Sequence, residues 1–305
     1  MKVLIVGLGS IAKKHIIALK NINNAIEIYA LRSHQNAKEI EFVKNLFHMK
    51  DVLCEKFDFA IISNPTSEHL KTLESLIQLD IPIFIEKPLY HKLELDNILK
   101  TVNELGIITY VGCNLRFLGA VQFVKKYIND KKEILNEVNS YCGSYLPEWR
   151  KGVDFRKNYS AIPELGGGVH LDLIHELDYI YWFFGVPKKT IRFLSNSSSL
   201  NIDAIDYANY LLDYSRFRVN VVLNYYRRDA KRVLELVYQD ETIKVDLLKD
   251  IVYSSEKGKL FKGKTDVQET YNKQMKYFVD CVLNKRETFN TINDAYKVLK
   301  ITLNK

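Results

Sequence analysis

The chain has 305 residues, 47% of them hydrophobic, and 44 Lys and Arg against 37 Asp and Glu give a formal net charge of +7. This length and composition are typical of a globular protein and suit two domains. No apolar stretch is long enough to span a bilayer. The basic residues form no long run, which argues against nucleic-acid binding and leaves an attraction for anionic small molecules. The four Cys have no CxxC spacing, as expected for buried free thiols in a reducing, cytoplasmic compartment.

The first 115 residues alternate short apolar runs with amphipathic stretches. Five runs are typical of buried strands: Lys2–Val6, Ala25–Leu31, Phe57–Ser63, Ile81–Glu86 and Ile107–Gly112. The spacing of apolar residues between them predicts helices over Ile11–Asn21, Asn36–Phe47, Glu68–Leu79 and Lys92–Leu105. Strands that are apolar throughout and alternate with helices predict a parallel sheet covered on both faces.

The pattern changes after about residue 120. A helical stretch, a strand-like stretch, a polar loop and a second helical stretch follow in turn: Ala120–Asn129, Ile134–Tyr145, Pro147–Gly168 and Val169–Phe184. Consecutive runs rich in Val, Ile, Tyr and Phe then extend from Lys188 to Phe261, which favours a mostly antiparallel sheet. Val267–Asn284 and Thr291–Asn304 have helical patterns. We therefore predict an α/β domain over residues 1–118 and an α+β domain over residues 119–305.

A glycine-rich turn, Gly7-Leu8-Gly9-Ser10-Ile11-Ala12, lies directly between the first strand and the first helix. Gly7 permits the tight turn, Gly9 lets the backbone approach a pyrophosphate, and Ala12 is small enough for helix–strand packing. The amides of Ser10 and Ile11 would face that pyrophosphate at the helix N-terminus. With the surrounding βα units this turn predicts a dinucleotide site; the alternative is a glycine turn without a ligand.

The end of the second strand bears on the choice of cofactor. A site that prefers NAD usually has an acidic residue there, which binds the ribose 2′-hydroxyl. This sequence has Arg32 and Ser33 instead, a pair suited to a 2′-phosphate. We therefore favour NADP(H) over NAD(H); the alternative is that Arg32 stacks on the adenine or faces solvent.

Lys87 follows the strand Ile81–Glu86, within Glu86-Lys87-Pro88. Ligands of open α/β sheets bind at the carboxyl ends of the strands, so this position can face a substrate. A Lys there can give or take the proton of a hydroxyl group while a hydride moves. The alternative is an ordinary solvated Lys after a strand.

A second cluster of polar residues follows three glycines, in the block Gly166–Asp178. On the helix expected over Val169–Phe184, a rotation of 100° per residue puts Asp172, His175 and Glu176 within one arc, opposite the apolar stripe. His175 can then relay a proton, and Asp172 can orient it or bind a sugar hydroxyl. His170 would lie about 160° around the helix from His175, so a metal site is not expected.

Together these features resemble the Gfo/Idh/MocA oxidoreductase family, named after glucose–fructose oxidoreductase and inositol dehydrogenase. The similarity runs along the chain through the motifs Gly7–Ala12, Asn64-Pro65 with His69, Glu86-Lys87-Pro88, Asn114-Leu115-Arg116-Phe117 and Gly166–Asp178. Asp172 and His175 are three residues apart where many members have a spacing of four. Gly119 stands where many members have Pro.

The resemblance implies a Rossmann domain followed by a domain with a large open sheet, often used for oligomerisation, so we expect a homodimer or homotetramer. It implies that Lys87 is the residue nearest the transferred hydrogen and that Asp172 and His175 contact the substrate. Further cofactor contacts are expected from Asn64, Pro65, His69, Glu86 and Asn114, and a further substrate contact from Arg116.

The segment from Trp149 to Ser160 resembles a bacterial branch of the family associated with sugars of surface polysaccharides. Its basic residues Arg150, Lys151, Arg156 and Lys157 border the glycines and can meet a phosphate or carboxylate. We therefore count Trp149, Arg150 and Arg156 as candidate substrate-binding residues. A solvated basic loop is the alternative.

These observations indicate an NAD(P)-dependent dehydrogenase or reductase acting on a CH–OH group of a sugar, polyol or nucleotide-sugar. Its expected partner is a small, sugar-like and anionic substrate, with no nucleic acid, membrane or metal. Two alternatives stay open: a non-catalytic dinucleotide-binding sensor or scaffold, and a reductase of an imine or conjugated double bond.

Overall fold

The computed structural model describes residues 1–34, 39–150, 152–264 and 266–304. The chain divides into two compact units. Unit 1 is Met1–Asn114 together with Val267–Leu299, and unit 2 is Leu115–Asp266 together with the chain from Lys300 onward. This division differs from the single boundary predicted after residue 118, because the C-terminal helical segment returns to unit 1.

Unit 1 contains a six-stranded sheet, sheet A, in the order β3-β2-β1-β4-β5-β6. Every neighbouring pair in it is parallel. Its strands are β1 (Lys2–Val6), β2 (Glu27–Leu31), β3 (Val43–Leu46), β4 (Phe59–Ile62), β5 (Ile83–Glu86) and β6 (Thr109–Gly112). This strand order, which reverses between β1 and β4, is that of the Rossmann fold and confirms the predicted α/β class.

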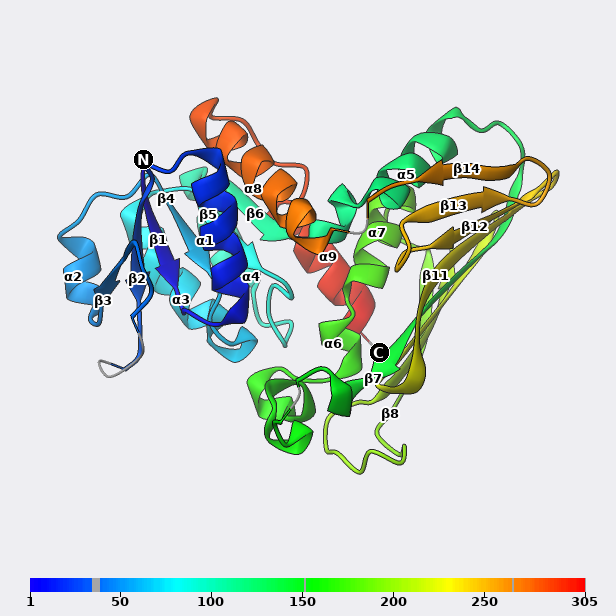
Figure 1. Cartoon of the computed structure of the whole chain (residues 1–305), viewed down its shortest axis with the longest axis horizontal. Coiled ribbons are helices and arrows are strands. Elements are labelled where there is room, and N and C mark those ends of the chain that lie inside the picture. The colour runs from blue at the N-terminus through cyan, green and yellow to red at the C-terminus, as the bar shows by residue number, and fades with distance from the viewer. Residues whose placement is uncertain (35–38, 151, 265, 305) are drawn as a thin grey trace. The chain divides into compact units, whose positions relative to one another are not determined.

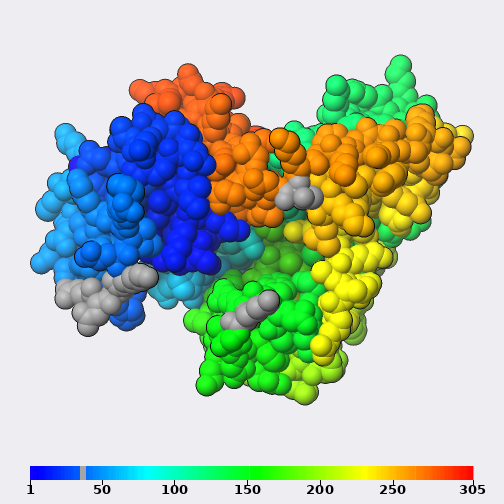
Figure 2. Space-filling model, viewed as in Figure 1, coloured from blue at the N-terminus to red at the C-terminus, as the bar shows by residue number. Residues whose placement is uncertain are grey.

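Helices cover both faces of sheet A, and α1 and α3 lie on opposite faces (Figure 1). The helices of this part of the chain are α1 (Ser10–Ile22), α2 (Met49–Leu53), α3 (His69–Leu76), α4 (Asp96–Leu105), α8 (Val267–Leu283) and α9 (Ile292–Leu303), with short 3-10 turns η1 (Thr66–Glu68) and η2 (Ile77–Leu79). Helix α8 lies beside α1 (Figure 2). Its Phe278 ring packs edge-on against Phe59 and Phe84, with centroids 5.2 and 5.5 Å away.

The predicted helix over Asn36–Phe47 is wrong where the structure can be compared with it. Residues 36–38 lie outside the described residues, and Val43–Leu46 forms strand β3, paired with β2 at the edge of sheet A. Phe42 has φ 65°, a left-handed conformation through which an α-helix does not continue. Hydrogen bonding to β2 therefore overrides the helical spacing of these apolar residues.

Unit 2 contains an eight-stranded sheet, sheet B, in the order β14-β13-β12-β11-β7-β10-β9-β8. Its strands are β7 (Leu135–Tyr145), β8 (Lys189–Ser195), β9 (Tyr207–Asp213), β10 (Arg218–Asn224), β11 (Tyr226–Tyr238), β12 (Thr242–Asp246), β13 (Ile251–Ser254) and β14 (Gly258–Lys262). β7 and β10 are parallel and the other neighbours are antiparallel. The predicted, mostly antiparallel sheet is confirmed.

One face of sheet B is covered by helices, as Figure 1 shows for α5 and α7. The helices of unit 2 are α5 (Gly119–Asp130), α6 (Val169–Asp172) and α7 (His175–Phe184), and 3-10 turns η3 (Asn114–Phe117), η4 (Leu146–Glu148), η5 (Phe155–Lys157), η6 (Tyr159–Ala161) and η7 (Pro163–Leu165) lie in the connections. Tyr179 of α7 hydrogen-bonds Ser140 of β7 at 2.7 Å. Ile191 and Phe193 of β8 remain exposed. Within the described part of the chain, no helix is long and apolar enough to cross a membrane.

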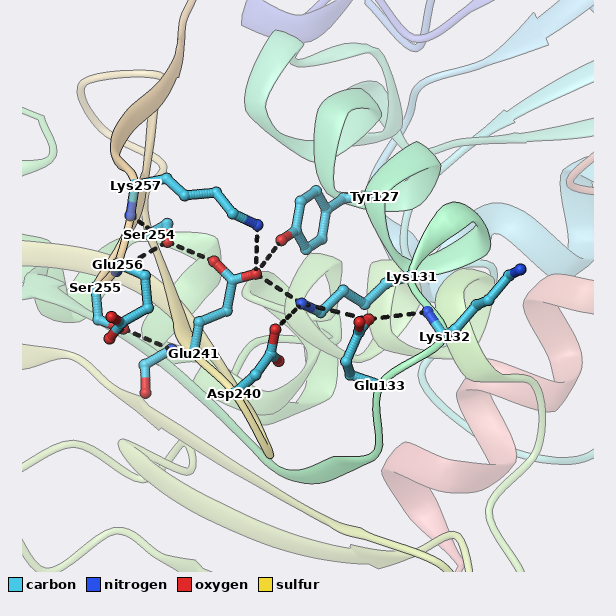
Figure 3. A network of polar contacts seen from close by, with 11 residues as sticks. Tyr127, Lys131, Lys132, Glu133, Asp240, Glu241, Ser254, Ser255, Glu256 and Lys257 are labelled. Carbon is cyan, nitrogen blue, oxygen red and sulfur yellow. Dashed lines mark hydrogen bonds and ion pairs between the residues drawn. The ribbon is translucent and has the colours of Figure 1, made fainter.

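A polar network ties α5 to the hairpins of sheet B, and it centres on the buried carboxylate of Glu241 (Figure 3). Oε1 accepts hydrogen bonds from Tyr127 Oη at 2.5 Å, Lys131 Nζ at 2.7 Å and Lys257 Nζ at 3.1 Å, and Oε2 accepts one from Ser254 Oγ. Burial alone would raise the pKa of Glu241, but the hydrogen bonds from Lys131 and its neighbours outweigh it and lower the pKa to about 2. The network therefore holds an ionised carboxylate in the interior.

Candidate active site

The glycine turn of unit 1 has the geometry that a dinucleotide pyrophosphate requires. Gly7 has φ +84°, and a Cβ added there would lie 2.7 Å from the backbone of Asn64, so only glycine fits between the two loops. A Cβ added at Gly9 would meet no atom within 4 Å, which leaves open space above the turn. Ser10 begins α1, whose N-terminus has no side-chain cap. An anionic group can reach this N-terminus through that space, and the free amides and the helix dipole there favour its binding.

The loop after β4 supports this turn from the neighbouring strand. Ser63 Oγ donates to the Gly7 carbonyl oxygen at 3.0 Å, and Asn64 Nδ2 donates to Thr72 Oγ1 at 2.8 Å. Pro65 then precedes the 3-10 turn η1. Asn64 and Pro65 thus lie beside the glycine turn, at the carboxyl edge of sheet A where the sequence predicted them.

His69, predicted as a cofactor contact, has a structural position. Its residue is 3% exposed, and its ring nitrogens lie 3.2 Å from the Leu89 carbonyl oxygen and 3.0 Å from that of Asn64. Burial lowers the pKa of His69. The imidazole therefore joins the loop after β4 to the loop after β5, and its predicted contact with the cofactor stays a prediction.

Arg32 and Ser33 follow β2 directly, at the same carboxyl edge of sheet A. The Arg32 amide donates to the Leu46 carbonyl oxygen at 2.9 Å, which continues the pairing with β3. Arg32 Nη1 donates to Asn45 Oδ1 at 3.3 Å, and the Ser33 side chain is exposed. The two residues stand where the ribose of a dinucleotide lies in this fold.

Lys87 follows β5 directly, and the residue before it, Glu86, forms a buried pair with His15. His15 Nε2 and Glu86 Oε1 are 2.6 Å apart, and both side chains are buried. The other carboxylate oxygen of Glu86 accepts a hydrogen bond from the Lys87 amide at 3.2 Å. Glu86 therefore fixes the backbone of Lys87, and its predicted contact with the cofactor stays a prediction. No role for His15 is predicted above, although a histidine on the apolar face of α1 indicates a buried polar partner.

Asn114 lies at the end of sheet A, in the turn that follows β6. It is buried, and its Nδ2 donates to Thr270 Oγ1 of α8 at 2.8 Å. Asn114 thus connects the returning C-terminal segment to the carboxyl edge of unit 1. The sequence predicted its location but not this partner, because Thr270 is 156 residues away along the chain.

In unit 2, Asp172 and His175 lie on two helices instead of one. Asp172 ends α6 and His175 begins α7. The amides of Ile174 and Glu176 bond to carbonyl oxygens three residues earlier, as in a 3-10 turn. The predicted common arc on one continuous helix is therefore wrong, since the rotation per residue changes at this break.

Asp172 contacts Tyr225, which in turn packs against Trp149 near the start of the polar loop. Tyr225 Oη donates to Asp172 Oδ2 at 2.5 Å, and burial followed by the charge of Asp172 raises the pKa of Tyr225. The indole of Trp149 meets the Tyr225 ring edge-on at 5.3 Å, and its Nε1 donates to Ser144 Oγ at 2.9 Å. The structure thus brings Trp149 and Asp172 to one place through Tyr225, a residue that sequence reasoning missed.

The basic loop presents exposed guanidinium groups. Arg150 and Arg156 are exposed, Arg156 Nη2 lies 3.4 Å from the Leu200 carbonyl oxygen, and its guanidinium lies 4.5 Å from the centre of the Phe155 ring. Lys151 lies outside the described residues. Arg150 and Arg156 can therefore meet an anion from solvent.

Arg116 and Glu176, by contrast, lie in the interior of unit 2. Arg116 is fully buried, with Nε and Nη2 bonded to the two carboxylate oxygens of Asp178 at 2.8 and 2.7 Å. This ion pair occupies the guanidinium of Arg116, and its predicted contact with the substrate stays a prediction. Glu176 is likewise buried and accepts hydrogen bonds from Arg232 Nε at 2.8 Å and Tyr179 Oη at 2.7 Å, so it faces sheet B rather than an open surface.

A parallel sheet with the Rossmann strand order and an open glycine turn before α1 suits the binding of a dinucleotide. Residues 1–113 match the family described as "Oxidoreductase family, NAD-binding Rossmann fold". This segment is therefore similar to the NAD-binding Rossmann domain of the Gfo/Idh/MocA oxidoreductases.

The chain is also similar to a characterised relative and to solved structures. Glucose-6-phosphate 3-dehydrogenase of Bacillus subtilis is 28% identical over 197 residues, which are 60% of this chain and 53% of that relative, so the match spans about half of its length. Two solved structures match 99% of this chain: scyllo-inositol dehydrogenase from Lactobacillus casei with NAD(H) and scyllo-inositol (19% identity, 94% of that chain, TM-score 0.81), and UDP-N-acetylglucosamine 3-dehydrogenase from Acidithiobacillus ferrooxidans (18%, 95%, TM-score 0.80). At these identities the structural matches show the two-domain fold.

Proposed function

We propose that this protein is an NAD(P)-dependent dehydrogenase or reductase that acts on a CH–OH group of a sugar, polyol or nucleotide-sugar. The observation that carries the proposal is the pairing, on one edge of sheet A, of the open glycine turn at Gly7 and Gly9 with Lys87 at the end of β5. When bound, the nicotinamide dinucleotide supplies or accepts the hydride.

Lys87 then exchanges the proton of the reacting hydroxyl, a role that suits an ammonium group fixed at a strand end. Its backbone is fixed by Glu86, which is itself held by His15. Asp172 accepts a hydrogen bond from a substrate hydroxyl beside Tyr225, and His175 assists in binding or in proton transfer. Trp149, next to Tyr225, offers an apolar surface to a sugar ring.

The cofactor we favour is NADP(H). Arg32 and Ser33 stand at the end of β2, and no acidic residue follows that strand to bind a ribose 2′-hydroxyl. A guanidinium and a hydroxyl group suit a 2′-phosphate.

The substrate we favour carries an anionic group. Arg150 and Arg156 are exposed on the loop that leads to Gly166–Gly168, and guanidinium groups bind phosphate and carboxylate with two hydrogen bonds. The name of the Bacillus subtilis relative, glucose-6-phosphate 3-dehydrogenase, is in keeping with this choice.

We further propose a cytoplasmic homo-oligomer that associates through the uncovered face of sheet B. Ile191, Phe193 and Leu211 are exposed large apolar residues on adjacent strands of that face. The four cysteines are free thiols, and the three buried ones suit a reducing compartment.

The decisive experiment incubates the purified protein with NAD⁺ or NADP⁺ and a panel of sugars, sugar phosphates, inositols and nucleotide-sugars, and follows absorbance of the reduced cofactor. Stereospecifically deuterated reduced cofactor and the matching keto sugar should put deuterium on the carbon that bears the new hydroxyl. Deuterium transfer to an imine or alkene carbon would replace the proposal by the corresponding reductase. Tight cofactor binding without turnover of any compound would replace it by a sensor.

A further inference from the structure

A cavity of about 320 Å³ lies at one end of sheet B, and none of the residues proposed above to bind the cofactor or the substrate lines it. Its walls come from the end of β8, the following loop and the first residues of β9 and β11, and consist of Phe193, Ser195, Ser197, Ser198, Asp206, Tyr207 and Tyr226. All of them belong to unit 2. We call this cavity the Asp206 pocket.

Asp206 contributes a buried carboxylate to this pocket. Its main chain is fixed on both sides, by the Ser195 carbonyl oxygen at 2.9 Å and the Tyr225 amide at 3.0 Å. Oδ2 accepts hydrogen bonds from the amide and the hydroxyl of Ser198, at 3.3 and 2.5 Å. Oδ1 has no hydrogen-bond partner among the described residues, and no cationic side chain there pairs with Asp206. A buried carboxylate in this situation lacks a compensating positive charge.

The walls of the pocket have the chemistry of a site for an organic cation. Ser195 and Ser197 place hydroxyl oxygens 2.7 Å from each other, and oxygen acceptors of this kind receive the hydrogens of an ammonium group. The rings of Phe193 and Tyr207 meet edge-on at 6.3 Å, and Tyr226 adds a third ring. Aromatic faces attract cations through their quadrupoles.

The charges around the pocket bear on the choice of ligand. Burial, and after it the charges of neighbours that include Asp206, raise the pKa of Tyr226. The pocket offers a single carboxylate, and no group of three or more His, Cys, Asp or Glu residues in the described ranges could hold a metal ion. A neutral polyol could donate to Oδ1 but would leave the charge uncompensated.

We propose that the Asp206 pocket binds a primary ammonium group, with Asp206 as its counter-ion, the serine and tyrosine hydroxyls as acceptors and the aromatic rings as walls. The ammonium comes either from a free small amine or from a lysine of a second copy of this chain, because Phe193 lies both in the pocket and on the exposed face of β8.

The test titrates the full-length protein with n-butylammonium chloride and, separately, with n-butanol at matched ionic strength, using ligand-observed NMR and the thermal unfolding midpoint. We expect saturable binding of butylammonium only. Asp206→Asn should weaken it at least tenfold, whereas Asp203→Asn, an exposed carboxylate in the same loop, should leave it unchanged. Equal binding by Asp206→Asn, or equally tight binding of n-butanol, would overturn the proposal.

If Asp206→Asn does not fold, Phe193→Ala and Tyr226→Phe test the same pocket while keeping the carboxylate. Each should weaken butylammonium binding several-fold, and unchanged binding in both rejects the site. Light scattering distinguishes the two sources. If a lysine of a second copy fills the pocket, butylammonium and Asp206→Asn both lower the molecular mass; if the ligand is a free amine, neither does.

Discussion

Arg116 and Asp178 form a two-point ion pair inside unit 2, with both side chains almost completely removed from solvent. The guanidinium of Arg116 also lies 5.5 Å from the centre of the Trp182 ring. Two parallel hydrogen bonds fix the turn after β6 to α7, the helix that begins with His175. Arg116 therefore fixes the position of α7, which carries the proposed substrate-binding residue His175.

Replacing Arg116 by Met should destabilise the protein by about 3–5 kcal/mol, because it leaves the Asp178 carboxylate buried without its partner. Urea unfolding measures the loss. The double variant Arg116→Met with Asp178→Leu should recover part of it, and Arg150→Met, at an exposed arginine, should unfold like the wild type. If Arg116→Met is as stable as the wild type but no longer binds substrate, Arg116 contacts the substrate directly.

Two glycines in the same turn should respond to alanine in opposite ways. Gly7→Ala places a Cβ against the Asn64 backbone at a positive φ, and should cost at least about 1–3 kcal/mol of stability. Gly9→Ala enters open space and should fold normally, but its methyl group should weaken dinucleotide binding tenfold or more, since it occupies the approach of the pyrophosphate. Thermal unfolding without cofactor and calorimetric titration with NADP(H) separate the two effects. A destabilised Gly9→Ala with normal affinity contradicts this assignment.

Lys87→Ala should leave dinucleotide affinity nearly intact and reduce kcat by about 10²–10⁴-fold, the range for loss of a general acid–base group. Lys92→Ala, an exposed lysine a few residues later, is the matched control and should turn over normally. Steady-state kinetics on the best substrate of the panel measure both. Normal turnover of Lys87→Ala would remove Lys87 from the mechanism.

Arg32→Ala tests the choice of cofactor. If the guanidinium binds a 2′-phosphate, the dissociation constant for NADP(H) should rise at least tenfold while that for NAD(H) changes little. Fluorescence titration of the reduced cofactors measures the ratio. An equal rise for both cofactors indicates adenine stacking instead, and no change indicates that Arg32 does not contact either.

The Glu241 network predicts a specific loss of stability in acid. The pKa of Glu241 is lowered to about 2 in the folded protein from 4.5, so its contribution is complete above about pH 4.5 and is lost as the pH falls towards 2. Glu241→Gln should therefore reduce the steepness of the fall in stability across this window. Glu256→Gln, an exposed neighbour in the β13–β14 turn, is the control. Identical pH profiles of Glu241→Gln and the wild type would contradict the role of the ionised carboxylate.

The features that the sequence predicted correctly depend on neighbours along the chain. Gly7 and Gly9 directly follow a strand that is apolar throughout, and Lys87 directly follows another, so their place at the edge of sheet A could be predicted from adjacent residues. Strand β3 could not, because Val43–Leu46 has no strand pattern of its own and is fixed by pairing with β2.

Contacts between residues far apart along the chain also limit what the sequence can predict at the candidate site. Arg116 and Asp178 are 62 residues apart, and Tyr225 and Asp172 are 53 apart. No local spacing distinguishes an arginine that binds a ligand from one that meets a buried aspartate. The break between α6 and α7 contains neither Pro nor Gly, so nothing in the sequence indicates that the helix is interrupted there.

The return of the chain to unit 1 has a consequence for synthesis. Sheet A is complete by Gly112, but Phe278, which covers Phe59 and Phe84, leaves the ribosome more than 160 residues later. In the nascent chain, the rings of Phe59 and Phe84 therefore lack the cover of Phe278 until all of sheet B has been synthesised. Such a chain depends on chaperones during translation more than one whose domains follow each other.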